Sequence, residues 1–141
     1  MWGRPSLDNG KILAQVLPAN TNETLAYTVP SAAAVTSAHA SVGSLTAAIA
    51  PKSVALQTQA IVTSIHVCNV HSGAVTFKIR LKETSGAGDN DKEFLFYENS
   101  VSNANTAILD LNLPLIAGNL IKVQSSVASK LAFNIFGIEV T

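Results

Sequence analysis

The sequence predicts an all-β protein, a single antiparallel β-sandwich of jelly-roll-like form. Along most of the chain apolar and polar residues alternate with a period of two, which is typical of strands with one buried face. Short apolar runs end at proline, glycine or polar turn residues about every ten residues, the spacing of an antiparallel sandwich. β-Branched residues are frequent within these runs. The 141 residues are enough for one domain with its own core.

Residues 1–10 contain glycine and proline and show no strand period, so we expect an extended N-terminal arm before a sandwich domain of residues 11–141. Trp2 is the only tryptophan, and tryptophan is a preferred anchor at protein interfaces. We expect Trp2 and Arg4 to contact a neighbouring protein chain. The alternative is an arm that folds back on its own domain.

The first two strands of the domain are short and end at prolines. The apolar run 11–17 stops at Pro18, and a second run over 24–29 stops at Pro30 after a polar turn. Proline has no N–H to donate to a strand ladder, so it closes both strands.

The next stretch, residues 31–58, is predicted to be an apolar insertion between two strands of the sandwich. Residues 31–50 carry no charge and have neither helical nor strand periodicity. Such low polarity is unfavourable on a free loop, so we expect neighbouring subunits to cover it, and a flexible linker is the alternative. The candidate interface side chains of the insertion are Val35, His39, Val42, Leu45 and Ile49.

A long strand, or two strands joined by a bend, is predicted over 54–70, which lacks both glycine and proline. A hairpin follows, with strands near 75–83 and 93–99. Its first strand alternates, so that Val75, Phe77, Ile79 and Leu81 should face the core and Lys78, Arg80 and Lys82 should face solvent or a neighbour. Three further strands are expected over 107–113, 120–126 and 131–140.

The hairpin loop "GAGDND" raises the question of a bound ion. A phosphate loop needs a helix after its glycines, whereas an aromatic strand follows here, so phosphate binding is rejected. Calcium could use Asp89, Asn90, Asp91 and Glu93, but their spacing is not that of a helix–loop–helix calcium site. We interpret the loop as a solvated turn in which Gly86 and Gly88 allow positive φ angles.

No other residues form a recognisable chemical site. His66, Cys68 and His71 do not have the spacing of a zinc site, and the single cysteine allows no disulfide within the chain. The many serines lack a strand–turn–helix elbow, and the carboxylates form no evident pair. We therefore predict no enzymatic activity, no catalytic residue, no bound metal and no cofactor.

The composition favours protein partners over other partners. Only 13% of residues are charged while 48% are hydrophobic, so part of the surface is expected to face other protein. Nine basic and nine acidic residues cancel, which argues against binding to nucleic acid or an anionic membrane. The first residues do not resemble a secretory signal, and no apolar run approaches the length of a spanning helix. We expect synthesis in a reducing cytoplasm.

Three stretches, "AQVLPANTNETLAYTVP" (14–30), "SIHVCNVHSGAVTFKIRL" (64–81) and "LAFNIFGIEVT" (131–141), resemble small all-β structural proteins of tailed bacteriophages. In those proteins a strand, a proline and a "YTVP"-like strand open the domain, a "CN" strand leads into a hairpin, and a "FGxE" strand ends the chain. The insertion at 31–58 departs from that pattern. The matching residues are Pro18, Tyr27, Thr28, Val29, Pro30, Cys68, Asn69, Phe136, Gly137 and Glu139.

The resemblance implies a non-enzymatic virion protein made in the host cytoplasm. Our first hypothesis is a capsid decoration or cement protein that binds the outer shell, with the major capsid protein or another virion protein as its partner. The resemblance also implies a homo-oligomer, by preference a trimer. A tail, baseplate or fibre-adaptor protein is the second hypothesis.

Two hypotheses come from other functional classes. A carbohydrate-binding jelly roll needs exposed aromatic side chains on one face, and this sequence offers few. A metal-dependent enzyme on a cupin-like sandwich needs a histidine-rich ligand set, which three scattered histidines do not supply.

Overall fold

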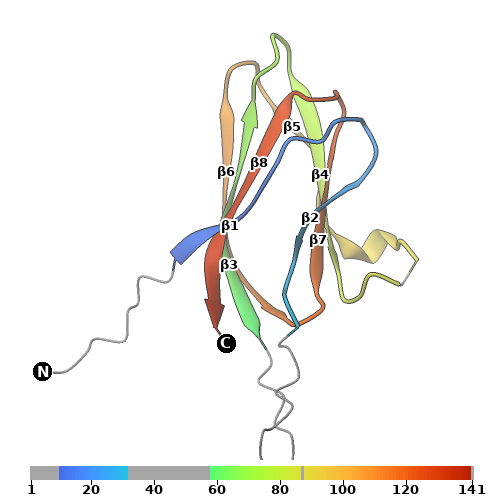
Figure 1. The fold of residues 1–141 in the computed structure, drawn as a ribbon. Coiled ribbons are helices and arrows are strands. Elements are labelled where there is room, and N and C mark those ends of the chain that lie inside the picture. The colour runs from blue at the N-terminus through green and yellow to red at the C-terminus, as the bar shows by residue number, and fades with distance from the viewer. Residues whose placement is uncertain (1–9, 32–57, 87, 141) are drawn as a thin grey trace, which may run out of the picture.

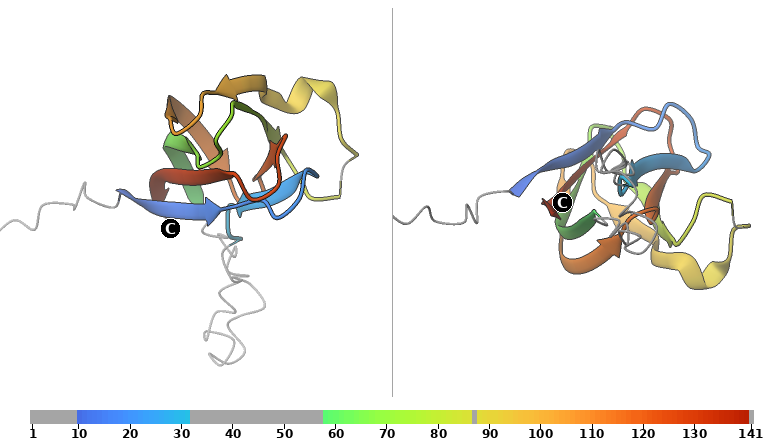
Figure 2. Two further views of the ribbon diagram at one scale, coloured as in Figure 1. Left: turned by 90° about the horizontal axis from the view of Figure 1, so that it is seen from above. Right: turned by 60° about the horizontal axis from the view of Figure 1, so that its bottom comes forward.

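The structure, a computed structural model, describes residues 10–31, 58–86 and 88–140. These residues form two antiparallel sheets of four strands each, which lie face to face as two layers (Figures 1 and 2). The strands are β1 (Gly10–Val16), β2 (Thr24–Thr28), β3 (Gln59–Asn69), β4 (Val75–Lys82), β5 (Phe94–Val101), β6 (Thr106–Ile116), β7 (Leu120–Ser125) and β8 (Leu131–Val140). A short 3₁₀ turn, η3 (Asp91–Glu93), precedes β5.

The strand order is that of a jelly roll. One sheet, called sheet A, has the order β1-β8-β3-β6, and the other, sheet B, has the order β2-β7-β4-β5. The antiparallel pairs β1·β8, β2·β7, β3·β6 and β4·β5 show that the chain is doubled back on itself and wound so that successive pairs alternate between the sheets. The predicted all-β sandwich of jelly-roll-like form is confirmed.

The core lies between the two sheets and is aliphatic around a few aromatic rings. The Phe77 ring of sheet B meets the Phe133 ring of sheet A edge-on, with centroids 6.1 Å apart. Phe96 approaches Phe77 from the neighbouring strand. The fully buried aliphatic side chains include Val29, Val62, Ile65, Val67, Ile79, Ile121, Leu131 and Ile135. These residues alternate along their strands with less buried ones, as the period of two predicts.

The described residues refine the predicted boundaries. Gly10 already belongs to β1, so the predicted arm loses its last residue to the sheet. Within the predicted run 54–70, β3 is one strand with a bulge between Val62 and Ser64, and the same irregularity occurs against both neighbouring strands. The arm residues 1–9 and the insertion residues 32–57 lie outside the described residues. All seven predicted interface side chains lie there: Trp2, Arg4, Val35, His39, Val42, Leu45 and Ile49.

The first strand of the hairpin corrects one prediction. Val75, Phe77 and Ile79 are buried as predicted, but Arg80 and Lys82 are buried as well, with 7% and 1% of their surface exposed. Both cations point to the outer face of sheet B, where the alternation puts them. They are buried because the loop between β4 and β5 lies on that side of sheet B (Figure 1), and carboxylates of this loop and of Glu23 pair with both cations.

Candidate protein interface

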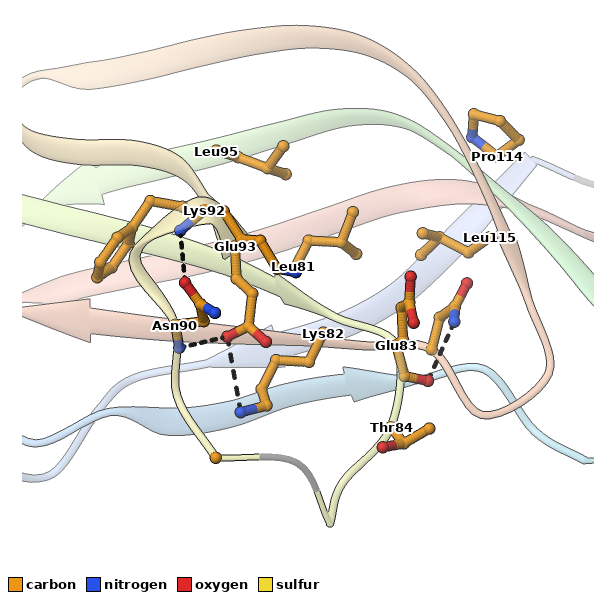
Figure 3. A pocket seen from close by; sticks show the side chains of 13 residues that line it. Leu81, Lys82, Glu83, Thr84, Asn90, Lys92, Glu93, Leu95, Pro114 and Leu115 are labelled. Atoms are coloured by element: carbon orange, nitrogen blue, oxygen red, sulfur yellow. Dashed lines mark hydrogen bonds and ion pairs between the residues drawn. The ribbon is translucent and has the colours of Figure 1, made fainter.

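The acidic loop covers the outer face of sheet B and is held there by the chain's own cations. Asp89 accepts a hydrogen bond from Lys82 at 2.6 Å and lies 3.5 Å from Lys122 of β7. Glu93 lies 3.7 Å from Lys82, and the close-up in Figure 3 shows the two side chains converging beneath the loop. The hydrogen bond between Lys82 and Asp89 raises the pKa of the Lys82 ammonium and lowers the pKa of the Asp89 carboxyl.

Arg80 is the second cation under the loop. Its guanidinium donates to Glu23 at 2.7 Å, to the Asn90 carbonyl at 2.7 Å and to Glu93 at 3.2 Å, and it lies over the Phe94 ring. Burial opposes the charge of Arg80, but the hydrogen bonds to Glu23 and Glu93 outweigh it and raise the pKa. Arg80 thus ties the turn before β2, the loop and β5 together.

The loop closes by a capped turn. The side chain of Asn90 accepts from the Lys92 amide, and the carboxylate of Glu93 accepts in return from the Asn90 amide at 3.1 Å, which is a capping box. The expected glycine geometry is not used, because Gly118 is the only described glycine with a positive φ.

Two of the three carboxylates that could have served calcium are engaged: Asp89 by Lys82, and Glu93 by Arg80, Lys82 and the Asn90 amide, while Asp91 is exposed. Across the described ranges, no group of three histidine, cysteine, aspartate or glutamate side chains lies close enough to hold a metal ion. His66 and Cys68 share the outer face of sheet A, where the His66 ring lies 4.8 Å from the Phe136 ring at a tilt of 58°. His71 lies beyond the end of β3, where its amide binds the Asn69 side chain.

A pocket of about 690 Å³ opens beside the loop (Figure 3). The apolar part of its lining comes from Leu81, Leu95, Pro114 and Leu115. At its lower edge the Asn119 side chain donates to the Glu83 carbonyl. The pocket thus follows from the way the loop rests against the β6–β7 turn.

The residues behind the sequence resemblance make structural contacts. Tyr27 of β2 donates to Glu139 of β8 at 2.6 Å, and Lys11 binds the other oxygen of the same carboxylate. Burial first, and then the bond to Glu139, raises the pKa of Tyr27. The bonds from Lys11 and Tyr27 lower the pKa of Glu139. The "YTVP" and "FGxE" motifs therefore join the two sheets at one end of the sandwich.

Two further motif residues serve the fold. The buried Asn69 amide donates to the carbonyls of Gly73, Val101 and Ser102, so it fastens the β3–β4 turn to the end of β5. At Gly137, a Cβ atom would lie 2.2 Å from the Ile61 carbonyl oxygen, so only glycine fits.

The outer face of sheet A is not covered by the described residues and carries exposed aliphatic side chains among mostly neutral polar ones. Strand alternation places residues of all four strands on it, and cross-strand partners form rows such as Ile12–Phe136 and His66–Ile108. Four aliphatic side chains on this face have more than half of their surface exposed: Ile12 (52%), Ile108 (61%), Ile116 (54%) and Val140 (55%). Ile61, Phe136 and Ile138 are half-buried among them.

Besides the Cys68 thiol, two ionisable side chains occur on this face of the described strands. Asp110 of β6 is exposed, and His66 of β3 is half-buried one row away. An apolar area of this kind is typical of a surface that other protein covers. The sequence analysis did not predict this apolar face. The run "LAFNIFGIEV" does indicate it, because Phe136 and Ile138 are apolar and lie on the face opposite to Phe133 and Ile135.

Comparison with protein-family models, with curated proteins and with solved structures finds no match to this chain. Within the part of the chain that is described, no helix has the length and apolar character needed to cross a membrane.

Proposed function

We propose that this chain is a non-enzymatic virion structural protein of a tailed bacteriophage, made in the host cytoplasm and incorporated into the particle as a capsid decoration or cement protein. The observation that carries the proposal is the outer face of sheet A. A domain that exposes four large aliphatic side chains on one sheet, with a single carboxylate among them, is built to be covered by protein.

Two more observations support a scaffold role. The fold is an eight-stranded jelly roll, an architecture that viral capsid proteins share with lectins and cupins, so it is compatible with the proposal without selecting it. The motif residues Tyr27, Asn69, Gly137 and Glu139 hold strands and turns together, which suits a structural protein defined by its packing.

The tail, baseplate or fibre-adaptor hypothesis uses the same face and the same fold. The trimer that the sequence resemblance implies also stays a prediction, as do contacts with the major capsid protein. Among the described residues, a carbohydrate site would use Tyr97, an exposed ring next to Phe94, but Lys78 already lies 4.4 Å over the Tyr97 ring.

Electron microscopy of purified virions labelled with a gold-conjugated antibody against this protein tests the proposal. Label distributed over the head supports a decoration protein. Label confined to the tail or baseplate would favour the adaptor hypothesis. Virions without label, from a lysate that contains the protein, would contradict a virion role.

A further inference from the structure

We propose that the outer face of sheet A binds the same face of a second copy of this chain in a two-fold symmetric contact. The inference rests on the proposed function only in using this face as a protein contact surface. It adds the identity of the partner, and contacts with other virion proteins then fall to the remaining surfaces of the domain.

The size of the face is the first argument. Sheet A has four strands of seven to eleven residues. With strands ~4.8 Å apart and a rise of ~3.3 Å per residue, the face measures ~20 by ~30 Å, or ~600 Å². Two such faces together bury ~1,200 Å², which is the lower end of the range for specific protein interfaces. Two sheets can also pack face to face with their strands roughly aligned, as they do inside sandwiches.

The placement of the ionisable side chains is the second argument. Asp110 on β6 pairs across the ladder with Ser64 of β3, and His66 lies two residues further along β3, on the same face. A two-fold axis between His66 and Asp110 brings each Asp110 to the partner's His66, because residues exchange places in an isologous contact. The imidazole N–H then donates to the carboxylate at both places, so the contact leaves no carboxylate without a partner.

Around such a pair the face carries aliphatic side chains together with neutral polar ones, among them Ser64 and the hydrogen-bonded Gln15 and Asn134. Ile12, Phe136 and Ile138 lie on one side of the His66–Asp110 pair, and Ile108 lies directly beside His66. A two-fold contact places apolar rows against apolar rows. A partner with an ordinary charged surface would instead have to bury charges against these side chains, which is costly.

The outer face of sheet B does not offer the same opportunity. Part of it carries the buried cations Arg80 and Lys82 and the loop that pairs with them, and the exposed Leu25 and Tyr97 belong to opposite edge strands of that sheet. Self-association through sheet A therefore uses the sheet whose outer face has no cover from the described parts of its own chain.

Sedimentation velocity of the full chain at micromolar concentration tests the contact, with variants in which the charges at positions 66 and 110 are changed. The wild type should sediment as a dimer. Asp110→Lys places a lysine against His66, and His66→Glu places two carboxylates together, so each should raise the dimer dissociation constant at least tenfold. The double variant Asp110→Lys/His66→Glu restores opposite charges and should dimerise again.

Two more variants keep the test independent of folding. Ile108→Lys changes a side chain that is exposed in the single chain, so it should dissociate the dimer without lowering the melting temperature. Leu25→Lys is the matched control, since Leu25 is 54% exposed on the edge strand of sheet B, and it should leave the dimer intact.

The two-fold dimer and the trimer implied by the sequence resemblance exclude each other, so a wild-type trimer would overturn the two-fold contact and favour the resemblance. A wild-type monomer, or dimers unaffected by Ile108→Lys and Asp110→Lys, would also overturn it. A monomer in solution that still labels virions would overturn only this inference and leave the proposed function standing. A protein that dimerises in solution but is absent from virions would overturn the proposed function and leave the two-fold contact standing.

Discussion

The two outer faces of this jelly roll differ in the side chains that they carry and in whether the described chain lies over those side chains. On sheet B the strands carry cations, and an acidic loop from the same chain lies over Arg80 and Lys82 and neutralises them. On sheet A the strands carry aliphatic side chains such as Ile12 and Ile108, and no described segment of the chain covers them. The cations of the first face are paired within the fold, whereas the aliphatic side chains of the second stay exposed, and we propose that other protein covers them.

The difference shows where the few charged side chains of this sequence lie. Lys82, Lys122, Asp89 and Glu93 meet beneath one loop, where their pairing is structural. Sheet A has Asp110 as the single carboxylate on its described outer face. A domain with few charges can therefore leave one face apolar by concentrating ion pairs on the other.

The largest expected effect comes from the core that both faces share. Phe77→Ala should lower the free energy of unfolding by about 3–5 kcal/mol, because Phe77 is 2% exposed and contacts rings from both sheets. Chemical denaturation measures this loss. Tyr97→Ala, an exposed site in the same sheet, is the control and should stay within about 0.5 kcal/mol of wild type. An unchanged Phe77→Ala protein would mean that the register of β4 is wrong.

A smaller loss is expected when the cover of sheet B is broken. Arg80→Ala leaves Glu23 and Glu93 without their guanidinium partner and should cost about 3 kcal/mol. Thermal and denaturant melts measure it. Lys78→Ala is the matched control, since Lys78 pairs with the exposed Glu98 at 3.3 Å outside the loop, and it should change stability little. Equal effects of the two variants would show that the loop does not depend on its buried cations.

Acid should release the same loop in the intact protein. The pKa of Asp89 is lowered by its bond to Lys82, and that of Glu93 by the Asn90 amide first and then by Arg80. Both pairings therefore stabilise the fold above the unfolded pKa values and are lost as the pH falls through the lower folded values, below about pH 4. The hydrogen-exchange protection factors of the Asn90, Lys92 and Glu93 amides, taken relative to the intrinsic rate at each pH, should fall there. Protection that persists at pH 2 would contradict this account of the loop.

Removal of divalent ions should have no effect. A bound calcium ion at a hundredfold excess over its dissociation constant would add about 2.7 kcal/mol of stability. Because Lys82 and Arg80 already meet the acidic side chains of the loop, a chelator should leave the melting temperature unchanged. A drop of several degrees, abolished in Asp89→Asn/Asp91→Asn, would show that the loop binds a metal.

The sequence predicted the strands well because their signal is local. Alternation in β4 and the prolines after β1 and β2 mark strands and their ends without reference to the rest of the chain. Burial of Arg80 and Lys82 could not be predicted in the same way. It depends on Glu23, 57 residues from Arg80 in sequence, and on a loop that folds back onto the sheet.

The sequence could predict that an interface exists, but not which surface forms it. Low charge indicates that some surface is covered, but it does not say which one. The residues chosen from the arm and the insertion lie outside the described residues, whereas the apolar face depends on bringing β1, β8, β3 and β6 together. Ile108 and Phe136 belong to separate apolar runs, and only the order of the strands puts them on one surface.

The most direct test of the central claim, that protein covers the outer face of sheet A, uses Cys68, the only cysteine of the chain. Cys68 is half-buried on that face, two residues from His66. Maleimide labelling followed by mass spectrometry should be slow in the assembled wild-type protein and at least tenfold faster in the Ile108→Lys variant. A cysteine placed at Tyr97 on sheet B, in a Cys68→Ser background, should label at one rate with and without Ile108→Lys. Equal labelling of Cys68 in the wild type and in Ile108→Lys would contradict the claim.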